Sequence, residues 1–359
     1  VVTNCTYNII NIININQKIG GDVVKENVGI LSTGVYIPDN YMDSEEIADN
    51  TGIPEDVIRE KFGITKKPIP GENDHTCAMG IKASNTAIEK AGIDPEEIDL
   101  VIWAGAEHKE YPMWTASIKL QHEIGAYNAW AFDIALRCGT MIMAMKVAKD
   151  MLLNNDEMNT VLIGSGYRNG DLIDFDNPKV SFMYNLGAGG TAVILKKGLD
   201  KNEVLKATAR TDGSLSESVV VPAGGTKNEL TAEGLENNEH HLDVLEPEFM
   251  KERLNEVSID NFVGVVKDSV KDSGYTMDDV DYIAILHMKY SAHKFMLDQL
   301  GLSEEQSIYL DEYGHIGQND QIISLELALE EGKVKPGDVV VFVSAGIGYA
   351  WNALTIKWG

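Results

Sequence analysis

Two segments of this sequence, about half a chain apart, follow one pattern. Residues 87–105 read AIEKAGIDPEEIDLVIWAG, and residues 269–287 read SVKDSGYTMDDVDYIAILH. Each predicts a helix that ends at a glycine, then an acidic turn, then a short apolar strand of the kind that is buried on both faces. Any two α/β units share such a pattern, but the matching glycine and aspartate positions favour a duplication. We therefore predict two copies of one α/β unit, each about half of the chain.

Predicted strands and helices alternate from residue 28 onward, which indicates an α/β fold. Buried strands are predicted at 99–104, 160–164, 191–195, 282–286 and 338–344. Helices are predicted at 44–50, 54–62, 75–91, 113–124, 139–154, 246–273, 291–300 and 320–331. Residues 222–245 show little periodicity and are predicted to form a surface excursion. The predicted halves span residues 28–200 and 201–359.

The first 27 residues differ in composition from the rest of the chain. Residues 8–16 read NIINIININ, an alternation that is also compatible with a short strand. Asn11 and Asn14 interrupt the apolar core that a signal peptide needs. We predict an appended tail over residues 1–27.

The balance of charges and the cysteine count limit the partners. The 359 residues include 56 acidic and 30 basic side chains, a formal charge of −26, and repulsion from phosphates disfavours nucleic-acid binding. No stretch approaches the roughly 18 apolar residues of a membrane span. Cys5, Cys77 and Cys138 include no CxxC pair, which argues against a zinc site or a disulfide framework. We expect a cytoplasmic protein with no membrane segment and no bound metal.

Cys138 is a candidate nucleophile. It follows the apolar stretch Phe132–Ala135 and precedes a predicted helix, so its sulfur lies near the positive end of a helix dipole, with Arg137 adjacent. Both features favour the thiolate, which is the reactive form. The alternative is a buried structural cysteine.

Two histidines lie at junctions where α/β proteins place their sites. His287 follows a predicted strand, at the carboxyl end that open α/β sheets use for ligands. His315 lies in the Gly-flanked turn Tyr313-Gly-His-Ile-Gly. A single histidine beside a strand is more often a hydrogen-bonded filler, but the coincidence with Cys138 favours a shared site.

The glycine-rich segments do not match a nucleotide-binding loop. Residues 187–191 open a strand, whereas a phosphate loop closes one strand and opens a helix. Residues 346–351 read GIGYAW between two predicted strands, so their backbone N–H groups either form part of an oxyanion hole or make a simple turn. No nucleotide cofactor is predicted.

The order of these landmarks resembles 3-oxoacyl-acyl-carrier-protein synthase III (ketoacyl synthase III). That family belongs to the thiolase superfamily, as does hydroxymethylglutaryl-CoA synthase. The resemblance covers about residues 28–359 and rests on Gly29-Ile…Gly34-Val-Tyr-Ile-Pro, Ala91-Gly…Ile98-Asp-Leu-Val-Ile, Asp133…Cys138-Gly, Gly187-Ala-Gly-Gly-Thr-Ala, His287, Tyr313-Gly-His, Gly332-Lys-Val-Lys-Pro-Gly-Asp and Gly346-Ile-Gly-Tyr-Ala-Trp.

The resemblance implies a duplicated, five-layer αβαβα sandwich, usually a homodimer. By motif, Cys138 matches the nucleophile that takes an acyl group from a CoA or carrier-protein thioester. His287 matches the histidine that stabilises the enolate of a malonyl extender, and the backbone N–H groups of Cys138 and Gly348 match the acyl oxyanion hole. The implied reaction is a Claisen condensation in fatty-acid or related secondary metabolism. No resident cofactor is implied, because the CoA or phosphopantetheine thioester is a substrate.

This chain departs from the family pattern at the second catalytic position. It has His315 where the family has asparagine, and His287-Met-Lys-Tyr where the family has His-Gln-Ala-Asn. The set Cys138, His287 and His315 resembles that of the elongating ketoacyl synthases and is compatible with decarboxylative condensation. Acyl transfer to another nucleophile and thioester hydrolysis stay open. Glu107 lies near the position of the acid/base glutamate of hydroxymethylglutaryl-CoA synthase, which would favour non-decarboxylative condensation, although a simple loop carboxylate is the alternative.

The family's CoA-stacking tryptophan and arginine have no counterpart near residues 58–67. Lys66, Lys67 and Arg137 are the candidate substrate-binding cations. Acyl carrier proteins are acidic, so docking one against a charge of −26 requires a local basic patch. A CoA-linked substrate is therefore the favoured prediction.

Overall fold

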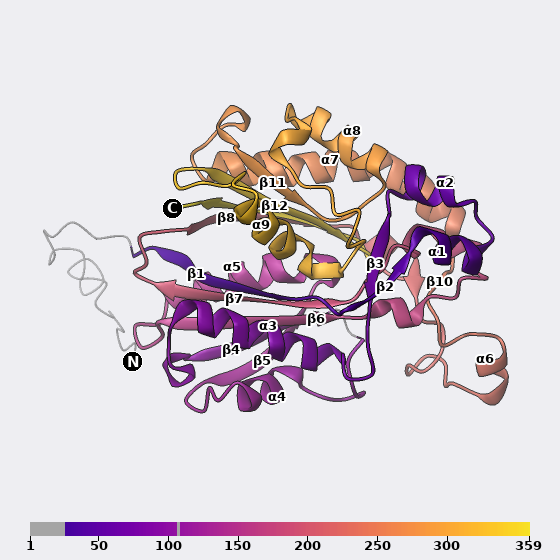
Figure 1. Cartoon of the computed structure of the whole chain (residues 1–359), viewed down its shortest axis with the longest axis horizontal. Coiled ribbons are helices and arrows are strands. Elements are labelled where there is room, and N and C mark those ends of the chain that lie inside the picture. Colours follow the sequence, from indigo (N-terminus) through magenta and orange to yellow (C-terminus); the bar gives the residue numbers. More distant parts are fainter. Residues whose placement is uncertain (1–25, 106–107) are drawn as a thin grey trace, which may run out of the picture.

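A nine-stranded sheet runs through the molecule (Figure 1). The computed structural model describes residues 26–105 and 108–359, so almost all of the predicted tail at 1–27 lies outside the described residues. In spatial order the strands are β11 (Tyr282–Ile285), β12 (Val339–Gly346), β13 (Ala350–Lys357), β8 (Glu203–Thr211), β1 (Val28–Tyr36), β7 (Gly189–Lys197), β6 (Thr160–Tyr167), β4 (Leu100–Gly105) and β5 (Trp130–Ala135).

The sheet consists of two halves with one pairing pattern. In the first half β4 is parallel to β6, β6 is antiparallel to β7, and β7 is antiparallel to β1. In the second half β11 is parallel to β12, β12 is antiparallel to β13, and β13 is antiparallel to β8. The halves meet where Gly29 of β1 pairs with Glu203 of β8. This agreement confirms the predicted duplication.

Helices form three layers around the two halves of the sheet, which confirms the predicted αβαβα order. α5 and α9 lie between the halves, and their apolar side chains pack on strands of both (Figure 1). α3 and α4 cover the outer face of the first half, and α7 and α8 cover that of the second. The helices are α1 (Ser44–Thr51), α2 (Glu55–Val57), α3 (Thr76–Ala91), α4 (Ala116–Glu123), α5 (Thr140–Leu153), α6 (Ala232–Glu236), α7 (Pro247–Asp272), α8 (Tyr290–Leu300) and α9 (Asp320–Glu330).

The aspartate shared by the two sequence repeats has the same role in each half. Asp99 Oδ2 accepts hydrogen bonds from the backbone N–H groups of Asn159 and Thr160, at 2.7 and 2.9 Å. Asp281 Oδ2 accepts one from Val339 N at 2.8 Å. Each carboxylate fixes the start of its own strand against the parallel neighbour, which explains why both copies have an aspartate there.

Some predicted elements have different limits. The predicted helix 113–124 begins only at Ala116, and the predicted helix 54–62 divides into α2 and a π-helical turn over Ile58–Phe62. The surface excursion contains α6 and ends at β10 (Asp243–Val244), which pairs with β9 (Val219–Val220). A second hairpin pairs β2 (Asn40–Asp43) with β3 (Lys66–Ile69).

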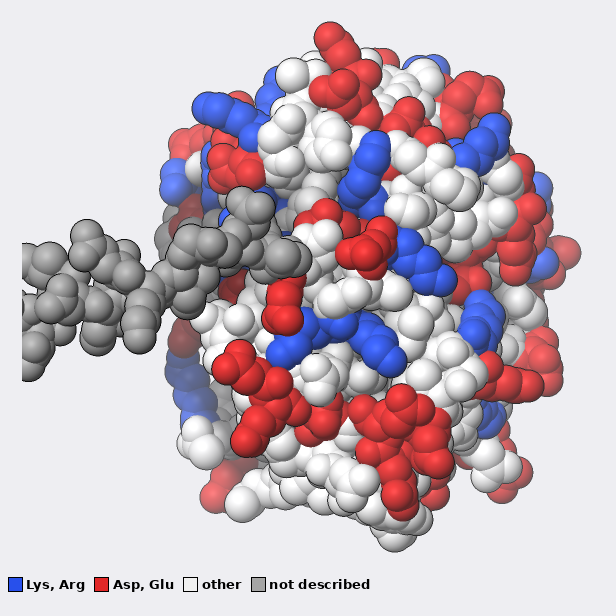
Figure 2. Space-filling model, turned by 90° about the vertical axis from the view of Figure 1, so that its left-hand side faces the viewer, with Lys and Arg blue, Asp and Glu red and all other residues white. Residues whose placement is uncertain are grey.

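Charge and hydropathy agree with the composition. On the face in Figure 2, acidic side chains spread over most of the surface, with Lys and Arg scattered between them. Within residues 26–105 and 108–359, no helix has the length and apolar character needed to cross a bilayer.

Candidate active site

Cys138 lies in the turn that joins β5 to α5. β5 ends at Ala135, a 3-10 turn spans Arg137–Gly139, and α5 begins at Thr140. The Thr140 hydroxyl accepts a hydrogen bond from Leu136 N at 2.7 Å, which closes the turn. Cys138 therefore lies at the N-terminus of α5, where the helix dipole has its partial positive charge.

The C-terminal half of the chain holds this turn in place. Ser344 Oγ on β12 donates to Cys138 O at 2.8 Å, and Asn352 Nδ2 on β13 donates to Gly139 O at 2.7 Å. A Cβ atom at Gly139 would lie 2.7 Å from Asn352 Oδ1, so the close approach of this turn to β13 requires glycine at position 139. Both halves of the duplicated fold therefore build one site.

His315 is the residue in direct contact with the cysteine. Its Nε2 lies 3.1 Å from Cys138 Sγ. Its backbone N–H donates to Asn185 O at 2.9 Å, and its carbonyl accepts from Gly187 N at 3.0 Å. The turn before it needs Gly314, which has φ +61 and whose Cβ would lie 2.3 Å from Asn185 O. The imidazole is therefore held by its backbone as well as by its ring.

Asp320, the first residue of α9, orients His315. Its side chain is fully buried, and Oδ2 accepts from His315 Nδ1 at 2.6 Å and from His287 N at 2.7 Å. Oδ1 accepts from Ile316 N at 2.7 Å. Nucleophile, imidazole and carboxylate thus form the chain of contacts that activates a nucleophile in acyl-transfer enzymes. Sequence reasoning missed Asp320, and the only signal was an aspartate five residues after His315 at a predicted helix start.

The charges around His315 decide its protonation. Burial alone would lower the pKa of His315, but the charges of Asp320 and Cys138, and hydrogen bonds to both, raise that pKa well above its usual value. The imidazole is therefore held as the cation, and it faces the sulfur with an N–H group. A cationic N–H group that faces the sulfur can stabilise negative charge on it.

His287 lies two residues beyond Ile285, the last residue of β11, and it is held neutral. Only 3% of it is exposed, and burial lowers its pKa to about 4. Its Nδ1 lies 2.9 Å from Asn185 Nδ2, and its Nε2 lies 3.3 Å from Gly63 O. Two imidazoles with different charge states thus serve one site, a pattern typical of catalytic centres.

One cavity brings the three residues together. A space of about 300 Å³ is lined by Cys138, His287 and His315. The rest of its wall is largely apolar and includes Phe62, Tyr167, Phe182, Met183, Leu186, Leu242, Leu286, Met288, Ile347 and Tyr349. A second space of about 510 Å³ also reaches Cys138, and Tyr167, Asn169, Leu242 and Ile347 line both. The nucleophile therefore lies where two spaces meet, the smaller of which is mainly apolar.

Two family models match the chain. The model described as 3-oxoacyl-[acyl-carrier-protein (ACP)] synthase III matches residues 132–213, and the one for its C-terminal part matches residues 270–358. The β-ketoacyl-[acyl-carrier-protein] synthase III of Aliarcobacter butzleri is 27% identical over 329 residues, which cover 91% of this chain and 96% of that protein. The chain is a 3-oxoacyl-[acyl-carrier-protein] synthase III-like protein.

Solved structures agree with this fold. The synthase III of Aquifex aeolicus has a TM-score of 0.78 and 22% identity, covering 92% of this chain and all of that one. A variant of OleA from Xanthomonas campestris with bound lauric acid and lauroyl-CoA has a TM-score of 0.77 and 18% identity, covering 92% and 99%. As a synthase III-like protein, the chain is an acyl-thioester condensing enzyme of the acyltransferase type.

The turn between β12 and β13 approaches the nucleophile of this synthase III-like site. A Cβ atom at Gly346 would lie 3.0 Å from Cys138 N, so the two backbones are close. Gly348, with φ +122, follows in the same turn and lines a depression of about 270 Å³ together with Arg137. The participation of Gly348 in an oxyanion hole stays a prediction.

The predicted substrate-binding cations are in three different environments. Arg137 lines the larger of the two spaces at Cys138. Lys66 forms an ion pair with Glu312 at 3.2 Å on the surface. The prediction for Lys67 is wrong, because only 2% of this side chain is exposed and its Nζ donates to Tyr184 O at 2.7 Å. Glu107, the predicted acid/base, lies outside the described residues.

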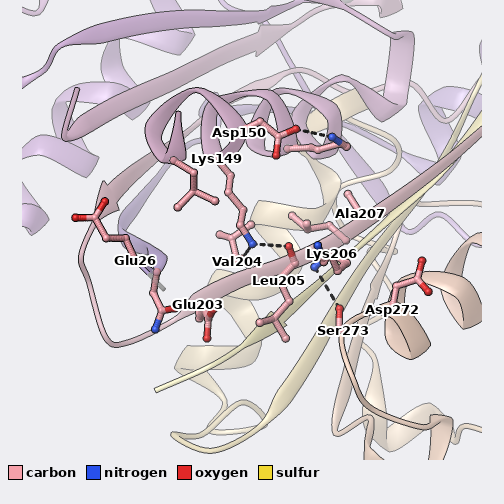
Figure 3. Close-up of a pocket in the computed structure, with 14 residues that line it drawn as sticks. Glu26, Lys149, Asp150, Glu203, Val204, Leu205, Lys206, Ala207, Asp272 and Ser273 are labelled. Carbon is pink, nitrogen blue, oxygen red and sulfur yellow. Dashed lines mark hydrogen bonds and ion pairs between the residues drawn. The ribbon is translucent and has the colours of Figure 1, made fainter. Parts of the chain in front are cut away.

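A further cleft lies at the other end of α5 (Figure 3). It measures about 390 Å³ and is bounded by the end of α5, the start of β8 and the end of α7. Lys149 Nζ donates to Leu205 O at 2.7 Å, and Lys146 pairs with Asp150 at 2.5 Å. No cysteine or histidine is among its described lining residues, so the cleft lacks the chemistry of the site at Cys138. Within the described ranges no group of three or more His, Cys, Asp or Glu has the arrangement of a metal site.

Proposed function

We propose that Cys138 accepts an acyl group from an acyl-CoA and that the acyl-enzyme then condenses with a malonyl thioester. The observation that carries this proposal is the contact chain from Cys138 Sγ through His315 to Asp320, with the neutral His287 at the same cavity. Splitting the reaction into acylation and condensation is the logic of covalent catalysis.

In the first step the Cys138 thiolate attacks the thioester carbonyl. The carbon–sulfur bond to CoA breaks, and His315 Nε2–H gives its proton to the departing CoA thiolate. Asp320 holds the opposite face of the ring through Nδ1–H, so the imidazole stays oriented as it becomes neutral. Because the carboxylate raises the pKa of His315, solvent then restores its proton.

In the second step the malonyl thioester loses carbon dioxide. The electron pair of the broken bond moves into the enolate, whose oxygen receives hydrogen bonds from His287 Nε2–H and His315 Nε2–H. The enolate carbon attacks the acyl carbonyl, the bond to Sγ breaks, and the Cys138 thiolate is regenerated beside the His315 cation. The product is a 3-oxoacyl thioester.

Two observations support a CoA-linked donor. The net charge of −26 disfavours the docking of a large acidic carrier protein. OleA, a structural neighbour, is described with bound lauroyl-CoA. We assign the enzyme to fatty-acid or related metabolism in the cytoplasm.

The unpaired edge of strand β5 supports the proposal that the protein forms a homodimer. β5 pairs only with β4 in the described sheet, so its other edge has open hydrogen-bonding groups. Trp130 on this strand is 53% exposed and stacks on Phe132 with ring centroids 5.6 Å apart. Trp130→Asp should convert a dimer to a monomer in analytical ultracentrifugation, with the exposed Tyr127→Asp, three residues earlier, as the matched charge control. A wild-type monomer at micromolar concentration would contradict the dimer.

Asp320 also favours a second candidate function. In the acyl-enzyme a neutral His315 oriented by Asp320 is a general base for water, a hydroxyl or an amine, which would give hydrolysis or acyl transfer. Incubation with lauroyl-CoA and malonyl-CoA distinguishes the two. Condensation yields a 3-oxoacyl thioester and carbon dioxide in equal amounts, whereas free lauric acid or transfer to an added alcohol without carbon dioxide would overturn condensation.

A further inference from the structure

One short segment contacts both active-site histidines. It links the 3-10 turn Pro178–Met183 to β7, and Asn185 is at its centre. The Asn185 side chain reaches His287 Nδ1 at 2.9 Å, and its backbone carbonyl accepts from His315 N at 2.9 Å. Asn185 is 7% exposed and lines the cavity that contains Cys138.

The hydrogen bonds at His287 determine which ring nitrogen has the proton. Gly63 O is a carbonyl and can only accept, so the bond from Nε2 requires the proton on Nε2. Nδ1 of the neutral ring is then an acceptor, and its partner must be the Asn185 amide nitrogen, which donates. We propose that Asn185 is a positioning residue that fixes the proton of His287 on Nε2, from which the extender thioester receives its hydrogen bond.

The buried side chain of Lys67 holds the segment in place. Lys67 Nζ donates to Tyr184 O. The Tyr184 hydroxyl lies 2.9 Å from both Phe175 O and Asn177 O, and these two carbonyls share its one hydrogen. The residue before Asn185 is therefore anchored at both its backbone and its side chain. This explains what the lysine predicted to bind substrate does: it supports the loop behind the site.

The inference rests on the proposed function, because a donor at Nε2 matters to the enolate step. It makes a separate claim about the tautomer. Asn185→Asp replaces the donor by a carboxylate acceptor, so the proton moves to Nδ1 and Nε2 loses its hydrogen. Asn185→Leu removes the donor at similar volume and leaves the bond from Nε2 to Gly63 O as the remaining restraint on the tautomer.

The test compares wild type, Asn185→Asp, Asn185→Leu and Asn255→Asp, an exposed position on α7 that adds the same charge. Nitrogen-15 shifts of the His287 ring should show an Nε2–H tautomer in wild type and Asn255→Asp, and an Nδ1–H tautomer in Asn185→Asp. Condensation kcat should fall about a hundredfold in Asn185→Asp, as loss of a catalytic donor does. Acylation of Cys138 and the KM for the acyl donor should stay within twofold.

The outcomes separate the two claims. An Nδ1–H tautomer in wild type, or an unchanged tautomer in Asn185→Asp, overturns the positioning role whatever the enzyme condenses. An Nε2–H tautomer that moves in Asn185→Asp, in a protein that forms no 3-oxoacyl product, supports the positioning role and contradicts the proposed function. If kcat falls equally in Asn185→Leu and Asn185→Asp and the two pH profiles are identical, the loss comes from altered packing and not from the position of the proton. That result would overturn the inference.

Discussion

His287 and His315 lie at the same cavity, and burial acts on both, yet their charge states differ. His315 faces the Asp320 carboxylate and the Cys138 sulfur, so its pKa is raised in spite of burial. His287 receives its contacts from an amide and a carbonyl, so burial prevails and its pKa falls to about 4. One ring can therefore give a proton to a leaving thiolate, while the other donates a hydrogen bond without charge.

The variant Asp320→Asn tests the effect of the Asp320 carboxylate on the pKa of His315. Without the carboxylate charge, the largest influence that raises the pKa of His315 is lost, so this pKa falls and less of the imidazole is protonated beside Sγ. The alkylation rate of Cys138 by iodoacetamide at pH 6 should fall about tenfold, whereas an amide in place of the exposed Asp298 should change nothing. If Asp320→Asn is folded by circular dichroism and its Cys138 is alkylated at the wild-type rate, Asp320 does not activate Cys138.

The residues that sequence reasoning found and missed differ in one physical respect. Cys138, His287 and His315 are at strand ends and in a glycine-flanked turn, positions that a one-dimensional pattern identifies. Asp320 acts across five residues that fold back on themselves, and Asn185 contacts His287 across 102 residues of sequence. A lysine in a short strand such as Lys67 is normally exposed, and only the packing of Tyr184 and Phe175 over it shows otherwise.

At the scale of elements, the β5–α5 turn depends on β13. A methyl group at Gly139 would push against the Asn352 amide, which cannot move away without losing its bond to Gly139 O. Strand β13 belongs to the C-terminal half, so the nucleophile is positioned by an element more than two hundred residues away in sequence.

Gly139→Ala is therefore expected to misplace Cys138. Overpacking of this kind costs about 1–3 kcal/mol of unfolding free energy, and a nucleophile displaced by about 1 Å loses about a hundredfold in rate. Gly213→Ala is the control, because a Cβ atom at Gly213 would have no other atom within 4 Å. Acylation rates and chemical denaturation measure both quantities, and a Gly139→Ala enzyme with wild-type acylation would contradict the packing argument.

His293 on α8 makes the free energy of unfolding depend on pH. His293 is buried against the Tyr309 ring at 5.2 Å, and burial lowers its pKa to about 4. The unfolded chain therefore binds more protons than the folded chain between pH 4 and 6.5, and the free energy of unfolding is lost as pH falls through that window. Relative to His293→Leu, wild type should lose about 2 kcal/mol between pH 6.5 and 4 in urea denaturation. A parallel pH profile of the two proteins would show that His293 does not titrate in this window.

At the scale of the whole molecule, the duplication explains where the site is. Strand pairing repeats in both halves, and the sequence repeat predicted this from a shared glycine, a shared aspartate and an apolar strand. The helix limits were less predictable, since α4 begins where packing against β5 begins rather than where the apolar pattern does. Because α5 and α9 meet between the halves, Cys138 at the start of one and Asp320 at the start of the other come together around His315.

The central claim is that Cys138 forms an acyl-enzyme, and mass spectrometry after incubation with acyl-CoA tests it. We predict one acyl group per chain on the peptide that contains Cys138, with none in Cys138→Ala. Cys77 should stay unmodified, because burial raises its pKa to about 12. An acyl group that persists in Cys138→Ala, or no acyl group on wild type with donors from acetyl-CoA to lauroyl-CoA, would contradict the account.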